Sequence, residues 1–246
     1  MKRELKEQIK RDELVTGFQN VVAWSQAHQH ELRIAIGVAV VVGAAAAGFA
    51  YVQGNRQREA ERAFMEAVAI YEAPVASELA PGADKPSGPV FATAEEKFKT
   101  AAAAFDGVER RHGTLPVAVR AGYYAALSRI EIKQFAEAEK ALRALAERKD
   151  TARLEPALAR LALADLHRRQ GQVDKAVEEY RAIAGDAALP LPRDYALMRL
   201  AGTLEDARRL SEAVAAYKRL TEEFPASVYA GEARRKVDYL QTAAQG

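Results

Sequence analysis

The stretch IAIGVAVVVGAAAAGFAYV, residues 34–52, constrains this chain of 246 residues more than any other feature. It holds no charged side chain across nineteen positions. A helix rises about 1.5 Å per residue, so this stretch would measure about 28 Å, close to the roughly 30 Å hydrocarbon core of a bilayer. A soluble core helix would carry a polar stripe every three or four residues, and this stretch has none. We therefore expect a transmembrane helix over residues 34–53.

The flanks of the stretch agree with a membrane span. Arg33 and Arg56 bracket it, Trp24 lies upstream, and Tyr51 sits where the far interface would be. Tryptophan and tyrosine are common at such interfaces. Two alternatives stay open, a cleaved signal peptide and a buried helix of a soluble protein. The small residues of AAAAGFA would suit cleavage, but 33 residues before the apolar region are unusual for a signal peptide.

Basic residues predict the orientation of the span. Residues 1–33 carry six lysines and arginines, whereas residues 54–73 carry three. Because positive charge is favoured on the cytoplasmic side, we expect a cytoplasmic N-terminal tail and a periplasmic C-terminal domain in a bacterial inner membrane. Apolar residues share one helical face of the tail, which predicts a partly amphipathic helix there: Leu14, Phe18, Val21 and Val22.

Composition excludes several kinds of partner and site. The 36 basic and 34 acidic residues nearly cancel, giving a net charge of +2, so we expect no nucleic acid partner. The chain has no cysteine. This excludes disulfides, thiolate zinc sites and a lipid-modified cysteine. The bilayer and other proteins remain as expected partners.

Internal repetition is the strongest signal after the span. Three segments align without gaps in a 34-residue frame, near 119–152, 157–190 and 194–227. Frame positions 8 and 20 hold alanine in every segment: Ala126, Ala164, Ala201, Ala138, Ala176 and Ala213. Positions 24 and 27 hold large residues: Leu142, Leu145, Tyr180, Ile183, Tyr217 and Leu220. Small residues let the two helices of a hairpin approach, and large ones fill the space against the next hairpin.

This pattern resembles the tetratricopeptide repeat, which implies an all-α solenoid. A degenerate copy is expected just upstream, with Ala101, Phe105 and Val108 in its second helix. A capping helix is expected at the C-terminus, with an apolar seam of Ala230, Ala233, Val237 and Leu240. The predicted organisation is a tail (1–33), a transmembrane helix (34–53), a helix continuing from it (54–73), a Pro/Gly loop (74–92) and a solenoid with its cap (93–246).

No catalytic or metal-binding constellation is visible. Two of the four histidines, His28 and His30, are two residues apart and would point to different sides of a helix. His112 suits the carbonyl groups at a helix end, and His167 takes a packing position of the frame. No glycine loop for phosphate is present. We therefore expect that the chain is not an enzyme and that it binds no cofactor, metal or small-molecule substrate. A hydrolase or transferase site between helices stays a minor alternative.

A partner groove is predicted from the repeat frame. In such superhelices, first-helix positions 2, 5 and 9 line the concave face. Here they are Arg120, Tyr123, Leu127, Leu158, Leu161, Asp165, Tyr195, Met198 and Gly202. An apolar and aromatic groove suits a hydrophobic peptide or a packed helix. Alternatively, the 56–73 helix or the loop after it fills the groove from within.

Small residues in the apolar stretch form pairs four positions apart, the spacing that lets two membrane helices approach. They are Ala39, Gly43, Ala44, Ala47 and Gly48. Because alanine is so common here, chance is the alternative explanation of this spacing.

A short tail, one span and a C-terminal repeat array together resemble the bacterial single-pass family of YfgM-type ancillary Sec translocon subunits. The resemblance implies an inner-membrane protein with periplasmic repeats. It implies translocon subunits, a membrane-anchored chaperone and unfolded clients as partners, with a role in handing over secreted polypeptides. The alternative is a structural scaffold of an envelope or cell-division complex.

Overall fold

The computed structural model describes residues 24–79, 88–113, 115–148 and 154–243. These residues fall into two compact units, one up to Arg56 and one from Gln57 onwards. The amphipathic face predicted for the tail and the centre of the Pro/Gly loop lie outside the described residues.

The first unit consists mainly of an apolar helix. Helix α2 spans Gln29–Tyr71, and its final turns belong to the second unit. Every residue from 33 to 53 is exposed. Among the described helices, α2 is the one long and apolar enough to cross a membrane. An uninterrupted apolar surface of this length is what a bilayer solvates.

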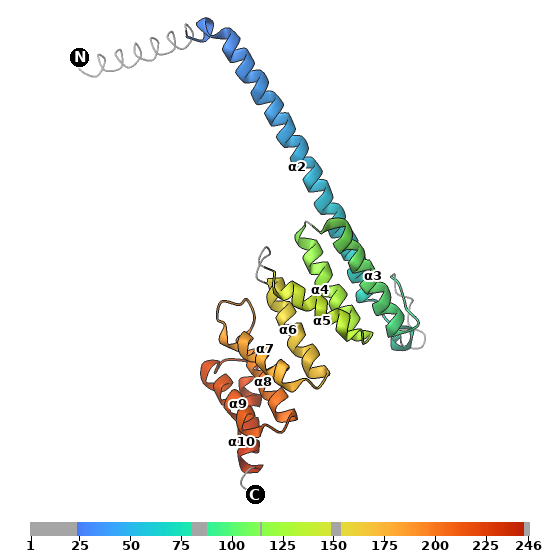
Figure 1. The fold of residues 1–246 in the computed structure, drawn as a ribbon, viewed down its shortest axis with the longest axis vertical. Helices are drawn as coiled ribbons and strands as arrows, with labels where there is room; N and C mark the ends of the chain where they lie inside the picture. The colour runs from blue at the N-terminus through green and yellow to red at the C-terminus, as the bar shows by residue number, and fades with distance from the viewer. Residues whose placement is uncertain (1–23, 80–87, 114, 149–153, 244–246) are drawn as a thin grey trace, which may run out of the picture. The chain divides into compact units, whose positions relative to one another are not determined.

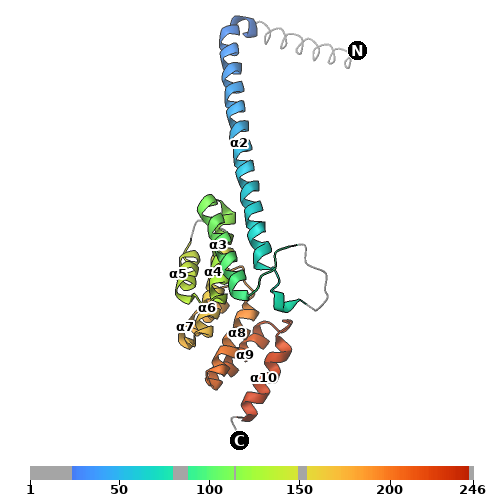
Figure 2. The ribbon, with the colours of Figure 1, turned by 90° about the vertical axis from the view of Figure 1, so that its right-hand side faces the viewer.

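The second unit is all-α. Its further helices are α3 (Ala94–His112), α4 (Pro116–Glu131), α5 (Phe135–Ala146), α6 (Leu154–Arg169), α7 (Val173–Gly185), α8 (Arg193–Asp206), α9 (Leu210–Glu223) and α10 (Ala230–Ala243). Each helix from α3 to α10 packs against the next one in the chain, and α4 also contacts α6. Figures 1 and 2 show these helices following one another as antiparallel hairpins. This is the solenoid architecture of tetratricopeptide repeats.

Alanine explains how closely the hairpin helices approach. The six alanines at frame positions 8 and 20 are all fully buried: Ala126, Ala138, Ala164, Ala176, Ala201 and Ala213. The large residues at positions 24 and 27 are buried as well, among them Tyr180 and Tyr217. On α10, the apolar seam from Ala230 to Leu240 is buried and closes the C-terminal end of the core.

Each of the three regular hairpins turns through one residue with positive φ. These residues are Lys133 (φ 60°), Gly171 (φ 72°) and Arg208 (φ 61°). The left-handed conformation closes the short connection between the two helices of a hairpin. Glycine adopts it without steric cost, whereas a side chain at the same position is disfavoured. Of these three hairpins, the middle one has glycine there.

The last turns of α2 pack into the solenoid. Ala60, Phe64 and Ala67 are buried in one cluster with Phe105 of α3 and Ala121 of α4. The segment predicted only as a continuation of the membrane helix therefore supplies the first helix of an additional hairpin, whose second helix is α3.

The ends of the predicted Pro/Gly loop are tied to each other. Val75 and Phe91 form an isolated parallel bridge, in which the amide of Ala76 donates to the Phe91 carbonyl at 2.8 Å. A short 3-10 helix, η1 (Ala76–Glu78), follows, and the Glu78 carboxylate accepts from the Val75 amide at 2.9 Å. Val75 is buried. The loop is therefore fixed to the fold at both described ends.

Candidate functional site

Four tyrosines lie along one face of the second unit, and they come from α2, α4, α8 and the turn before α10. We call this the tyrosine face: Tyr71, Tyr123, Tyr195 and Tyr229. Burial, followed by the nearby phenols of Tyr124 and Tyr71 and by Asp165 and Tyr195, raises the pKa of Tyr123 to about 12. The Tyr123 ring lies 5.7 Å from the Tyr124 ring, which in turn lies 5.5 Å from the Tyr71 ring of α2. The Tyr195 and Tyr229 rings are 6.0 Å apart, which extends the face to the start of α10.

Asp165 lies in the middle of the tyrosine face and is held from two sides. The Tyr180 hydroxyl donates to its carboxylate at 2.6 Å, and Arg199 of α8 forms an ion pair with it. Burial and the bond to Asp165 both raise the pKa of Tyr180. Burial acts to lower the pKa of Arg199, but its hydrogen bond to Asp165 and the charge of that carboxylate, together with Tyr180, outweigh burial and raise the pKa. Asp165 therefore joins two hairpins.

The same arrangement recurs one hairpin later. The Tyr217 hydroxyl donates to Glu205 at 2.8 Å, and Lys236 of α10 donates to the other oxygen of that carboxylate at 2.7 Å. Partial burial opposes the ionised form of Glu205, but the bonds from Lys236 and Tyr217 lower its pKa. In both cases a second-helix tyrosine and a cation of the next hairpin share one carboxylate.

The other predicted groove residues make more contacts within the chain than the repeat frame indicated. Arg120 forms an ion pair with Glu61 at 2.5 Å, and its guanidinium group lies 5.1 Å from the centre of the Phe64 ring. Leu127 packs partly against the core of the first regular hairpins, and Leu161 and Met198 pack against the C-terminal core. Leu158 and Gly202 are half-buried. The two predicted tyrosines and Asp165 therefore carry the chemistry of this face.

The predicted packing positions of the apolar helix are open to their surroundings. Ala39, Gly43, Ala44, Ala47 and Gly48 are all exposed on α2. A methyl group added at Gly43 or Gly48 would meet no atom within 4 Å. Nothing in the described chain packs against these positions, so association through them stays a prediction.

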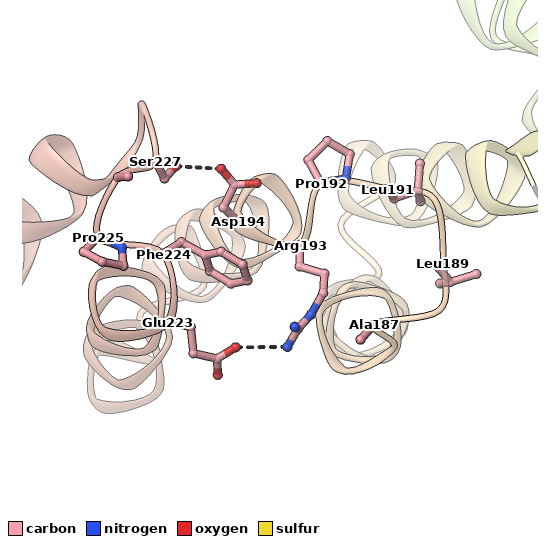
Figure 3. Close-up of a pocket in the computed structure, with 11 residues that line it drawn as sticks. Ala187, Leu189, Leu191, Pro192, Arg193, Asp194, Glu223, Phe224, Pro225 and Ser227 are labelled. Atoms are coloured by element: carbon pink, nitrogen blue, oxygen red, sulfur yellow. Dashed lines mark hydrogen bonds and ion pairs between the residues drawn. The ribbon is translucent and has the colours of Figure 1, made fainter.

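A separate pocket of about 480 Å³ lies where the loop before α8 meets the turn before α10 (Figure 3). Its wall is largely apolar: Ala187, Leu189, Leu191, Pro192, Phe224, Pro225 and Ala226. Its polar groups bind one another. Arg193 pairs with Glu223 at 2.9 Å, and the Ser227 hydroxyl donates to Asp194 at 2.7 Å. No histidine lines the pocket to activate Ser227 as a nucleophile.

The histidines do not form a site either. His167 is 4% exposed, and its Nε2 lies 3.6 Å from Glu139 of α5. Within the part of the chain that the structure describes, no group of three or more His, Asp or Glu residues is arranged to hold a metal ion. The strongest candidate site in the described residues is therefore the tyrosine face, whose rings and hydroxyl groups suit the binding of a partner.

Comparison with known families agrees with this architecture. The family described as tetratricopeptide repeat-like domain matches residues 23–194, and a tetratricopeptide repeat family matches residues 161–228. The chain belongs to the tetratricopeptide repeat-like family. Repeats of this kind bind proteins, so the chain has a role in protein–protein interaction. The two matches together run from before the apolar helix to the turn before α10.

Among solved structures, the tetratricopeptide repeat-like chain is similar to kinesin light chain repeats. One is a crystal structure of a point variant of the nearly identical TPR-like repeats of a putative kinesin light chain from Podosopora anserina. It is 15% identical, with a TM-score of 0.49, over 61% of this chain and 80% of that chain. A second structure of those repeats is 16% identical, with a TM-score of 0.44, over 61% and 90%. No curated protein matches the chain.

Two residues of the tyrosine face, Tyr71 and Tyr229, were missed in the sequence. Tyr71 lies in the segment that we assigned to the continuation of the membrane helix. Tyr229 precedes the capping helix and falls outside the repeat frame. Extending the frame upstream from Ala60, Phe64 and Ala67 would have found Tyr71, because these residues show the helical spacing of a first repeat helix.

Proposed function

We propose that this chain is a membrane-anchored adaptor that binds protein partners through the tyrosine face. The observation that carries the proposal is a set of half-buried tyrosines, Tyr71, Tyr123, Tyr195 and Tyr229, contributed by α2, α4, α8 and the turn before α10. Phenol rings offer a flat apolar surface with a polar tip, which is why tyrosine is frequent in protein interfaces.

The expected location is a bacterial inner membrane, with α2 as the anchor and the repeats in the periplasm. The exposed apolar surface of α2 supports its role as the anchor, and the basic residues before it support this orientation. A reporter that is active only in the periplasm, fused after Gly246, should be active. Activity of a cytoplasmic reporter at the same position would reverse the proposed orientation.

Within this role, the resemblance to YfgM-type subunits makes the Sec translocon and a membrane-anchored periplasmic chaperone the proposed partners. In this proposal the repeats hold an emerging polypeptide during handover between them. Mild detergent extraction should co-purify translocon subunits with the parent chain and recover less with Tyr123→Ala and Tyr195→Ala combined. Tyr239→Ala is the matched control, because Tyr239 is 67% exposed on α10. Recovery of folded envelope proteins without translocon subunits would instead favour the structural scaffold.

A further inference from the structure

Residues 24–33, WSQAHQHELR, lie directly before the apolar stretch of α2. We call this segment the membrane flank. Each of its residues is exposed or half-buried, and Trp24 is 55% exposed. An indole ring next to a helix that is long and apolar enough to cross a bilayer suits the headgroup region of the lipids. We therefore expect the membrane flank to lie among the headgroups at one end of the span.

The rings of Trp24 and His28 are stacked within the membrane flank. Their centres are 4.9 Å apart, their planes differ by 24°, and the Nδ1 atom of His28 lies 3.0 Å from the Trp24 carbonyl oxygen. Because a carbonyl oxygen only accepts, this hydrogen bond places the proton of a neutral His28 on Nδ1. The Nε2 atom then takes up the second proton, and the face of the indole ring favours the cation that results.

The net charge of the membrane flank depends on its two histidines. Arg33 (+1) and Glu31 (−1) cancel while both histidines are neutral, whereas protonation of both gives a net charge of +2. Histidine is the side chain that changes its charge between pH 5 and 8. The flank contributes no residue to the buried core of the described chain, so Glu31 and Arg33 are the charged groups beside these histidines.

An anionic headgroup complements the acid form of the membrane flank. Imidazolium and guanidinium groups donate charge-assisted hydrogen bonds to phosphate oxygens, and a negatively charged membrane surface attracts cations close to it. His30 and Arg33 are three residues apart and share one side of α2. His28 points to a different side, so each histidine would meet a separate lipid of the ring that surrounds the helix.

We propose that the membrane flank binds anionic phospholipids through His28 and His30, and that this binding becomes tighter as the pH falls. The inference rests on the proposed anchoring of α2 in a membrane and does not depend on the tyrosine face. The lysines and arginines of residues 1–11 also attract anionic lipids, but they keep their charge between pH 5 and 8. An increase with acid therefore distinguishes the histidines from these residues.

The test uses the full-length chain in nanodiscs of phosphatidylglycerol and phosphatidylcholine, of which one or the other is brominated near the headgroup end of an acyl chain. Bromine quenches nearby tryptophan, and Trp24 is the only tryptophan of the chain, so its fluorescence reports the lipids around the membrane flank. Each intensity is divided by that in unbrominated lipid at the same pH, because protonation of the stacked His28 itself changes the fluorescence. Between pH 8 and 5.5, the preference for phosphatidylglycerol should increase by about fivefold or more, as expected for added cations at an anionic surface.

Variants assign this increase to the two histidines. The combined His28→Gln and His30→Gln variant should show the same preference at both pH values. His112→Gln is the matched control, because it removes a histidine from α3 in the second unit and should leave the increase unchanged. Circular dichroism of each variant verifies its helical content.

The outcomes separate this inference from the proposed function. If neither brominated lipid quenches Trp24 at either pH, the proposed membrane anchor fails and this inference fails with it. If both lipids quench Trp24 but the preference is the same at both pH values, or if its increase persists in the combined variant, the inference is overturned while the anchor remains.

Discussion

The first hairpin of the solenoid, α2 with α3, and the two C-terminal hairpins, α6 with α7 and α8 with α9, are held to their neighbours by different chemistry. Between α2, α3 and α4, aromatic rings pack on one another: Phe105 lies 5.7 Å from Phe64 and 5.3 Å from Tyr124, measured between ring centres. Ion pairs join the same helices beside these rings, Arg120 with Glu61 and Arg129 with Asp106, but no tyrosine hydroxyl shares their carboxylates. From α6 to α10, alanines bring the helices close, and tyrosine hydroxyls bind carboxylates that a cation of the next hairpin also binds.

This difference shows that one architecture is stabilised in two ways. Ring packing is apolar and tolerates an irregular sequence, which explains why the first hairpin departs from the repeat frame. A shared carboxylate requires a tyrosine, an acid and a cation at matching places, so it fixes the angle between neighbouring hairpins as well as their distance. Since repeats contact mainly their neighbours, each kind of stabilisation should act locally.

The largest effect is expected from Phe105→Ala. Phe105 is fully buried, and its removal should lower the free energy of unfolding by about 3–5 kcal/mol. Hydrogen–deuterium exchange should lose protection in α3 and α4 more than in α8 and α9. Leu197→Ala, at a fully buried position of α8, is the matched control and should show the reverse distribution. An equal loss throughout the solenoid would contradict local stabilisation.

A smaller effect is expected from Tyr180→Phe. The change keeps the buried ring but removes the hydroxyl that donates to Asp165, so urea unfolding should show a loss of about 1–3 kcal/mol. Tyr217→Phe should behave in the same way through Glu205. Tyr239→Phe changes an exposed ring and should cost nothing measurable. If all three variants unfold alike, the shared carboxylates do not stabilise the C-terminal hairpins.

Lys236→Met should cost less, about 0–1 kcal/mol at neutral pH, because this pair is partly solvated. Glu205 has a pKa below its ordinary value of 4.5. Its contribution to stability is therefore present above about pH 4.5 and is lost as the pH falls through its lower folded pKa. Lys236→Met should flatten this acid dependence in urea unfolding at several pH values. An unchanged pH profile would show that Lys236 does not hold the carboxylate.

The smallest effect at neutral pH is expected from Tyr123→Phe. Because the pKa of Tyr123 is raised from 10.0 to about 12, the unfolded chain loses this proton first. Stability should therefore decrease as the pH rises from 10 to about 12, and Tyr123→Phe should make that decrease less steep. If the free energy of unfolding decreases equally steeply with pH in the parent and the variant, Tyr123 lies in a solvated environment.

Much of the fold could be predicted from the sequence because it depends on residue size at fixed spacing. The alanines at frame positions 8 and 20 and the seam of α10 are all buried. Burial of Ala101, Phe105 and Val108 agrees with the degenerate copy predicted upstream. The last turns of α2 were harder to assign, because their apolar face follows the membrane span without a break in the helix.

The site was less predictable, because pairing between hairpins has no fixed spacing. Asp165 is at frame position 9, whereas Glu205 is at position 12, yet both bind a tyrosine and a cation. Repeat position alone therefore named Tyr123, Tyr195 and Asp165 but not the cations that bind the two carboxylates, Arg199 and Lys236.

The central claim, that the tyrosine face binds proteins, is tested most directly by affinity for a permanently unfolded client, such as reduced and alkylated α-lactalbumin. Full-length chains in nanodiscs should bind it about 5- to 30-fold more weakly with Tyr123→Ala or Tyr195→Ala, corresponding to about 1–2 kcal/mol for each, at unchanged helical content. Tyr239→Ala should bind like the parent. If both face variants retain the parent's affinity, or if Tyr239→Ala weakens binding as much as they do, the tyrosine face is not the binding site.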